Sequence, residues 1–169
     1  MLCVRYIGLD VGDRWIGLAM GDDQSHLATP IRTLRRSSRS TAPDVDEIAR
    51  LYAREGAGAA IVGLPRNMDG SLGIQARRTL AFAVRLRAAG LVVDYCDERL
   101  SSAAAEDYVT GTRGRPLKRG ERIDHVAAAI ILQDYLDGAR CEIEDAETPI
   151  DPTISSAKPG AVASLLEGA

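Results

Sequence analysis

The stretch YIGLDVGDRWIGLAMGDD, residues 6–23, constrains the fold of this chain more than any other. Two apolar segments, 2–10 and 14–21, flank the short polar turn GDR, a pattern that predicts two antiparallel strands joined by a tight turn. The first segment ends on the carboxylate of Asp10. A carboxylate beside buried strands is costly unless it is paired or binds a cation. Asp10 is therefore either a turn residue that happens to be acidic or a ligand.

The rest of the chain predicts strands that alternate with helices. Further strands are expected over 27–34, 59–64 (AAIVGL) and 91–98 (LVVDYCDE). The expected helices cover four segments: 43–55, from an N-cap at Ser71 to about Ala89, from Ser101 or Ser102 to about Val109, and 121–137. An antiparallel meander followed by alternating strands and helices predicts a mixed α/β sheet with helices on both faces.

Length and composition indicate one domain and exclude some classes of protein. A chain of 169 residues suits a single core, and its apolar runs are too short to span a bilayer. The N-terminus is strand-like and lacks a signal-peptide pattern, so we expect a cytoplasmic protein without membrane partners. Three cysteines without ligand spacing (Cys3, Cys96, Cys141) are expected to be reduced. The predicted domain covers 1–138, and the acidic, Pro- and Ser-containing tail 139–169 is expected to be disordered.

Three acidic residues occupy the positions where such a fold collects functional groups. Asp10 and Glu98 end predicted strands, and Asp124 lies in the first turn of the last predicted helix. Carboxylates on three converging elements suit Mg²⁺ or Mn²⁺, and the chain offers no His/Cys set for zinc. Each acid alone has a simpler explanation. Asp10 could be a turn residue, and Glu98 could pair with Arg99 or Arg119. Asp124 could simply complement the dipole at the helix N-terminus. Their joint placement favours a metal site.

Neighbours of these acids are assigned lesser roles. Asp97 should point to the opposite face of its strand from Glu98, so it is a second-choice ligand. His26 and His125 are expected to be surface or packing residues. Both residues one turn beyond Asp124, Ala127 and Ala128, are small, which would allow that helix to pack closely on the sheet.

Nineteen of the twenty-one basic residues are arginine, the better partner for phosphate. They concentrate in two segments, 32–39 and 111–122, and ordinary solvated surface would explain this equally well. The Gly- and Pro-containing loop 111–120 suits a clamp that closes on nucleic acid. Its candidate contacts are Arg113, Arg115, Lys118 and Arg119.

A second candidate contact with substrate lies in the loop PRNMDG, residues 65–70. Arg66 and Asn67 could bind nucleic acid there, because the free N–H groups of the following helix favour a phosphate. A plain turn that caps the helix through Ser71 explains the loop equally well. On that helix Gln75, Arg77 and Arg78 are expected to be solvated.

Four blocks of the sequence resemble a known family. IGLDVGDRWIGLAMGDD, IVGLPRNMDGSLGIQARR, DERLSSAAAEDYV and ERIDHVAAAIILQDYL occur in the order seen in the YqgF/RuvX family, and GLPRNMDGS and DERLSS are the specific parts. These proteins are assigned as Holliday junction resolvases with a ribonuclease H-like fold and also as pre-16S rRNA nucleases. The resemblance covers about residues 4–137 and leaves out the tail.

The resemblance implies a ribonuclease H-like five-stranded mixed sheet and a metal-dependent endonuclease. Asp10, Glu98 and Asp124 would be the catalytic acids and the ligands of Mg²⁺ or Mn²⁺. The implied substrate is structured nucleic acid, chiefly the 5′ end of pre-16S rRNA in ribosome biogenesis, with Holliday junctions as the alternative. Fold relatives often carry a fourth acid near the last one, whereas this chain has alanines there. This difference predicts a second metal that is weakly held or that binds only with substrate.

Two other classes of protein fit parts of the sequence. The turn after Asp10 is similar to the phosphate loop of actin-like ATPases and sugar kinases, but those need two such domains and this chain has one. A non-catalytic nucleic-acid-binding module of the same fold would be expected to have lost its acids, and here all three are present. A nuclease is therefore the favoured interpretation. Junction cleavage would require a homodimer, whereas rRNA processing would not.

Overall fold

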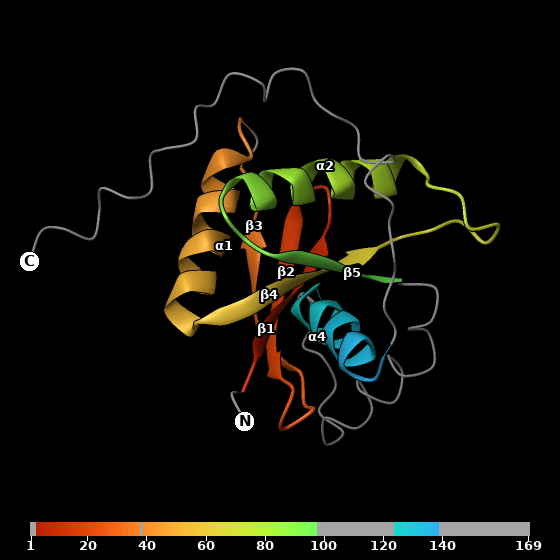
Figure 1. Cartoon of the computed structure of the whole chain (residues 1–169). Helices are drawn as coiled ribbons and strands as arrows, with labels where there is room; N and C mark the ends of the chain where they lie inside the picture. Colours follow the sequence, from red (N-terminus) through yellow and green to blue (C-terminus); the bar gives the residue numbers. More distant parts are fainter. Residues whose placement is uncertain (1–2, 38, 98–123, 139–169) are drawn as a thin grey trace, which may run out of the picture.

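The predicted strands form one mixed five-stranded sheet (Figure 1). The computed structural model describes residues 3–37, 39–97 and 124–138. In chain order the elements are β1 (Arg5–Val11), β2 (Trp15–Asp22), β3 (Thr29–Arg35), α1 (Ala42–Glu55), β4 (Ala57–Leu64), α2 (Ile74–Ala88), β5 (Val93–Asp97) and α4 (Asp124–Leu136). Glu98, the helix expected near 101–109, the basic loop 111–120 and the tail lie outside the described residues.

The strand order is β3-β2-β1-β4-β5. β1 pairs antiparallel with β2, and β2 pairs antiparallel with β3, as the expected meander requires. β1, β4 and β5 run parallel to one another, so their carboxyl ends meet at one edge of the sheet. The mixed α/β fold class is confirmed.

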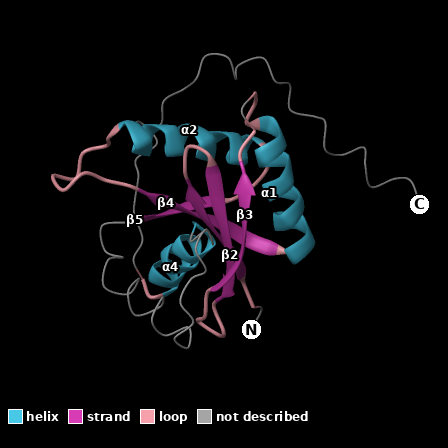
Figure 2. Ribbon diagram, turned by 180° about the vertical axis from the view of Figure 1, so that it is seen from behind, coloured by secondary structure: helices cyan, strands magenta, loops and turns pink. Residues whose placement is uncertain are grey.

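Helices cover both faces of this sheet, as Figures 1 and 2 show. α1 and α2 lie on one face, where Ile7, Leu9 and Val11 of β1 join their apolar side chains in the larger core. α4 lies on the other face and forms a second core with residues such as Ile61 and Cys96. Because side chains alternate along a strand, the two cores share the strands without sharing side chains.

The ends of the helices test the capping predictions. Gly56 ends α1 in the left-handed conformation (φ 60°), as expected for glycine after a helix. The N-cap predicted at Ser71 is wrong, because α2 is preceded by Gly73 and has no side-chain cap. The Ser71 hydroxyl instead donates to Asp69 Oδ1 at 2.6 Å within the preceding turn. The side chain that seemed to cap the helix stabilises a local turn.

α4 is buried on most of its surface. Ala128, Ile131 and Leu132 are all at most 4% exposed. At its far end Tyr135 donates a hydrogen bond to Asp94 Oδ2 at 2.7 Å and packs edge-to-face on Tyr6.

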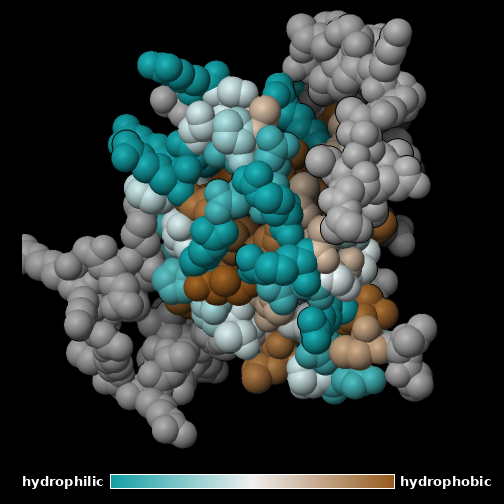
Figure 3. Space-filling model, turned by 90° about the vertical axis from the view of Figure 1, so that its left-hand side faces the viewer, coloured by the Kyte–Doolittle hydropathy of each residue, from teal (hydrophilic) through white to brown (hydrophobic). Residues whose placement is uncertain are grey.

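α1, in contrast, keeps an exposed face, and the view from that side shows a mainly hydrophilic surface around a smaller hydrophobic area (Figure 3). Among the described helices, none has the length and apolar character needed to cross a membrane.

Candidate active site

Two of the three predicted acids come together at the carboxyl edge of the sheet. Asp10 is the penultimate residue of β1 and pairs with Gly17 of β2. Its side chain lies on the same face of the sheet as that of Tyr6, the face that α4 covers, because side chains alternate along a strand and the two residues are four positions apart. α4 begins at Asp124, whose backbone lies directly over Gly17. The predicted convergence of Asp10 and Asp124 is therefore seen in the structure.

Asp10 is a largely buried carboxyl group that lies close to a second acid. Burial, and secondly the charge of Asp124, raise the pKa of Asp10 from 3.8 to about 6. Within residues 3–37, 39–97 and 124–138, the Asp10 carboxylate has no ion pair and no hydrogen bond. Two neighbouring carboxylates supply the oxygen donors that Mg²⁺ and Mn²⁺ prefer. The residues present fit a divalent cation.

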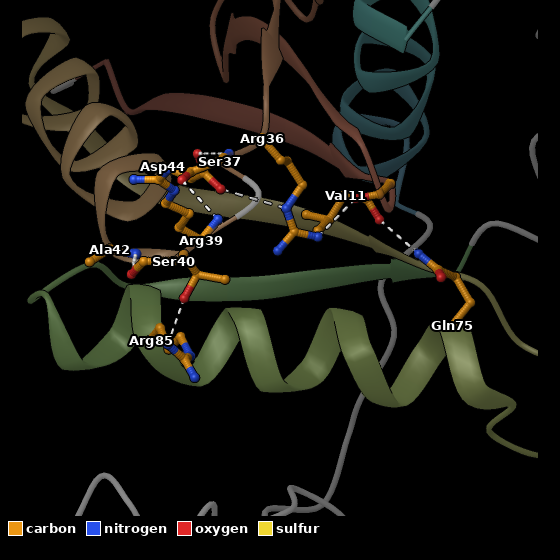
Figure 4. Close-up of polar contacts among 11 residues, drawn as sticks. Val11, Arg36, Ser37, Arg39, Ser40, Ala42, Asp44, Gln75 and Arg85 are labelled. Atoms are coloured by element: carbon orange, nitrogen blue, oxygen red, sulfur yellow. Dashed lines mark hydrogen bonds and ion pairs between the residues drawn. The ribbon is translucent and has the colours of Figure 1, made fainter.

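The backbone that follows Asp10 is held by two side chains from other elements (Figure 4). Gln75 of α2 donates from Nε2 to the Val11 carbonyl at 3.0 Å, and Arg36 donates to the Gly12 carbonyl at 2.9 Å. The sequence-based expectation that Gln75 is solvated is wrong, since it is half-buried against this turn. No local pattern marks Gln75 for this role, because its partner is far away in the sequence.

Arg36 is an inward-facing member of the 32–39 arginine group. Its Nε lies 3.6 Å from Asp44 Oδ2, and its guanidinium lies 5.1 Å from the centre of the Phe82 ring. Arg32 of the same group pairs with Glu47 on α1 at 2.6 Å. Two members of the 32–39 group, Arg32 and Arg36, thus have acidic partners within the protein.

The lesser assignments from the sequence also have outcomes. Asp97 is buried and, two residues after Tyr95 on β5, points to the same face of the sheet as Tyr95. Tyr95 packs in the core on the face opposite α4. Asp97 therefore points away from the Asp10 face, as expected. His125 packs against β3, with its Nδ1 3.3 Å from Thr33 Oγ1. His26 is exposed, with a φ of 49°.

The loop between β4 and α2 is internally bonded. Asn67 donates from Nδ2 to Ser71 Oγ at 2.8 Å, and Arg66 bridges to Leu72 through the backbone. The Asn67 side chain therefore has a structural partner in the loop. The Arg66 Nε is buried and has no hydrogen-bond partner among the described residues. On α2, Arg78 is exposed and pairs with Asp13 of the β1–β2 turn at 3.0 Å.

A second group of possible metal ligands lies at the opposite end of β1. It consists of Cys3, Asp22 and Asp23, and the sequence did not predict it. Both carboxylates already have local partners: Asp22 accepts the Ser25 N–H at 2.7 Å, and Asp23 accepts the Val4 N–H at 2.9 Å. These bonds explain the group as turn-stabilising acids.

The strand order, with one acid near the end of the first strand and another at the start of the last described helix, defines a ribonuclease H-like domain. The chain belongs to the RuvX family, described as Holliday junction resolvase, which matches residues 4–138. The family resemblance noted in the sequence is confirmed.

The chain matches its relatives over nearly the whole of their length. A protein of Anaeromyxobacter sp. named "Putative pre-16S rRNA nuclease" is 46% identical over 138 residues, which are 80% of this chain and 98% of the relative. A protein of the same name from Moorella thermoacetica is 44% identical over 135 residues, covering 79% and 95%. The solved structure "T. thermophilus RuvC in complex with Holliday junction substrate" is similar with a TM-score of 0.53 and 18% identity, covering 81% and 98%. At that identity the likeness concerns the fold alone.

Proposed function

We propose that this protein is a divalent-metal-dependent endonuclease that cleaves structured nucleic acid, with pre-16S rRNA as the favoured substrate. The observation that carries the proposal is the meeting of Asp10 and Asp124 at one edge of the sheet, where burial and the charge of Asp124 raise the pKa of Asp10 to about 6. Membership in the RuvX family and the name of the relatives support the hydrolytic nuclease class.

Asp10 and Asp124 would hold the metal, and Glu98 would complete the set of catalytic acids. Glu98 follows directly on β5, which is separated from β1 by β4 alone. When bound, Mg²⁺ or Mn²⁺ would activate a water molecule and stabilise the leaving oxygen of the phosphodiester. The chain itself contributes rigidity: Gln75 and Arg36 fix the backbone after Asp10, and the first turn of α4 fixes Asp124.

Basic and amide side chains around this edge would bind the nucleic-acid backbone. Arg66 and Asn67 lie at the carboxyl end of β4, next to β1, and precede the N-terminus of α2. Arg66 carries a positive charge and is preferred over Asn67, whose amide already has a partner within the loop. The other proposed contacts are Arg113, Arg115, Lys118 and Arg119. Phosphate contacts of this kind position the substrate and do not read its sequence.

The same site could cleave Holliday junctions, which is the second candidate function. The description of the RuvX family favours it. Symmetrical junction cleavage requires two sites related by a two-fold axis, so it predicts a homodimer, whereas rRNA processing is compatible with a monomer. We further propose a cytoplasmic location and a catalytic domain of residues 1–138, with 139–169 as a tail outside it.

A cleavage assay with both substrates tests the proposed function. The wild-type chain should cut a pre-16S rRNA fragment when Mg²⁺ or Mn²⁺ is present and should stop cutting when EDTA is added. Asp10→Asn should lose cleavage, while Asp46→Asn, an exposed acid on α1, should keep it. Preferential cutting of a four-way DNA junction would favour the second candidate. A folded wild-type chain that binds nucleic acid and cuts neither substrate would support a non-catalytic module.

A further inference from the structure

We propose that Gly17 is a positioning residue that sets the spacing between the carboxylates of Asp10 and Asp124. The proposal rests on the proposed metal-dependent function, because it concerns how two ligands of the same ion are held. Gly17 faces α4 from β2 and is the direct pairing partner of Asp10. It therefore lies beneath the point where the strand acid and the helix acid meet.

The first turn of α4 occupies the space that any side chain at Gly17 would need. A Cβ built on Gly17 would lie 1.8 Å from the carbonyl oxygen of Asp124 and 2.9 Å from the amide nitrogen of His125. Real Cβ contacts stay above 3.0 Å. Both atoms belong to the helix backbone, so no side-chain rotation can relieve the overlap. A residue other than glycine would have to push the first turn of α4 away from β2.

A second glycine under the same helix provides a comparison. A Cβ on Gly8 would lie 2.7 Å from the Ala128 carbonyl oxygen and 2.7 Å from the Leu132 Cβ. This overlap is much smaller, and it falls on later turns of α4, beyond Asp124. Gly8→Ala therefore measures how much stability is lost when α4 is crowded against the sheet at a point that does not displace Asp124 directly.

The contact of His125 with β3 fixes the same turn from another direction. His125 Nδ1 lies 3.3 Å from Thr33 Oγ1. With the backbone placed by Gly17 and His125, the short side chain of Asp124 has little freedom to change its reach. Two carboxylates bind one ion well only if their oxygens keep a spacing that suits it, so the backbone position of Asp124 should influence metal affinity.

Mn²⁺ binding to the full chain without substrate, measured by electron paramagnetic resonance, tests this role. Gly17→Ala should bind Mn²⁺ at least about tenfold more weakly than the wild type, within the range seen when residues that orient ligands are changed. Gly8→Ala should lose thermal stability but keep near-wild-type affinity. The double variant that combines Gly17→Ala with Asp124→Glu should recover part of the lost Mn²⁺ affinity, because the longer glutamate side chain can span the enlarged gap between the two acids.

Asp124→Glu alone provides an independent test if Gly17→Ala does not fold. With glycine in place, the longer side chain no longer suits the spacing, so Mn²⁺ should bind more weakly. Wild-type affinity in either Gly17→Ala or Asp124→Glu would overturn the positioning role and leave the metal site intact. A wild-type chain that does not bind Mn²⁺ would instead overturn the proposed metal site, and the positioning role would fall with it.

Discussion

Replacing Asp10 with asparagine should make the metal-free protein more stable at neutral pH. Asp10 is held in a partly buried position beside Asp124, and both features raise its pKa to about 6. An elevated pKa means that folding disfavours the ionised carboxylate. Asparagine has nearly the same shape and no charge, so it removes this penalty while preserving the packing.

The pKa shift gives the size and the pH range of the effect. The pKa is 3.8 in the unfolded chain and about 6 in the folded one, so between these values the folded state binds the extra proton. Stability therefore falls as pH rises through this interval and stays low above it. A pKa that rises from 3.8 to about 6 corresponds to about 3 kcal/mol. Since solvent reaches part of the Asp10 side chain, about 2 kcal/mol is the more reasonable expectation.

Urea unfolding in EDTA between pH 4 and pH 8 measures this difference. The free energies of unfolding of wild type and Asp10→Asn should lie close together at pH 4 and should diverge by about 2 kcal/mol in favour of the variant by pH 7. Asp46→Asn should show no such divergence. Adding Mg²⁺ should stabilise the wild type and leave Asp10→Asn unchanged, because only the former keeps the ligand. An Asp10→Asn protein that is less stable at pH 7 in EDTA would refute the reasoning.

Three further predictions concern other parts of the chain. Replacing the four proposed basic contacts of the loop 111–120 with Gln (Arg113, Arg115, Lys118, Arg119) should weaken substrate binding without changing Mn²⁺ affinity. Each lost phosphate contact should reduce the slope of log K against log salt by roughly 0.7 to 0.9. An unaltered slope would assign these residues to solvated surface. Deleting 140–169 should leave the melting temperature and the metal-dependent cleavage near those of the full chain, and a fall of many degrees would show that the tail docks on the domain. Tyr135→Phe removes the hydrogen bond to Asp94 and should lower the free energy of unfolding by about 1 to 3 kcal/mol in urea titrations, with unchanged Mn²⁺ affinity as the control.

The sequence by itself determined the local elements and the chemical character of the site. Alternating apolar residues on either side of a short polar turn give β1 and β2, and Gly56 ends α1 as expected. These patterns depend on interactions between near neighbours in the chain, which is why they can be read directly. The same local signals placed Asp10 at a strand end and Asp124 at a helix start, the two positions that proved to meet.

Only the tertiary structure decided how these elements meet, and local signals misled where side chains had distant partners. Ser71 looked like a helix cap but bonds within its own turn, and Gln75 looked solvated but holds the Val11 carbonyl. Arg36 belongs to an arginine-rich segment and yet faces inward. The close approach of α4 to Gly17 involves residues far apart in the sequence. Such contacts depend on the packing of the whole sheet against its helices, and no short window of sequence contains that information.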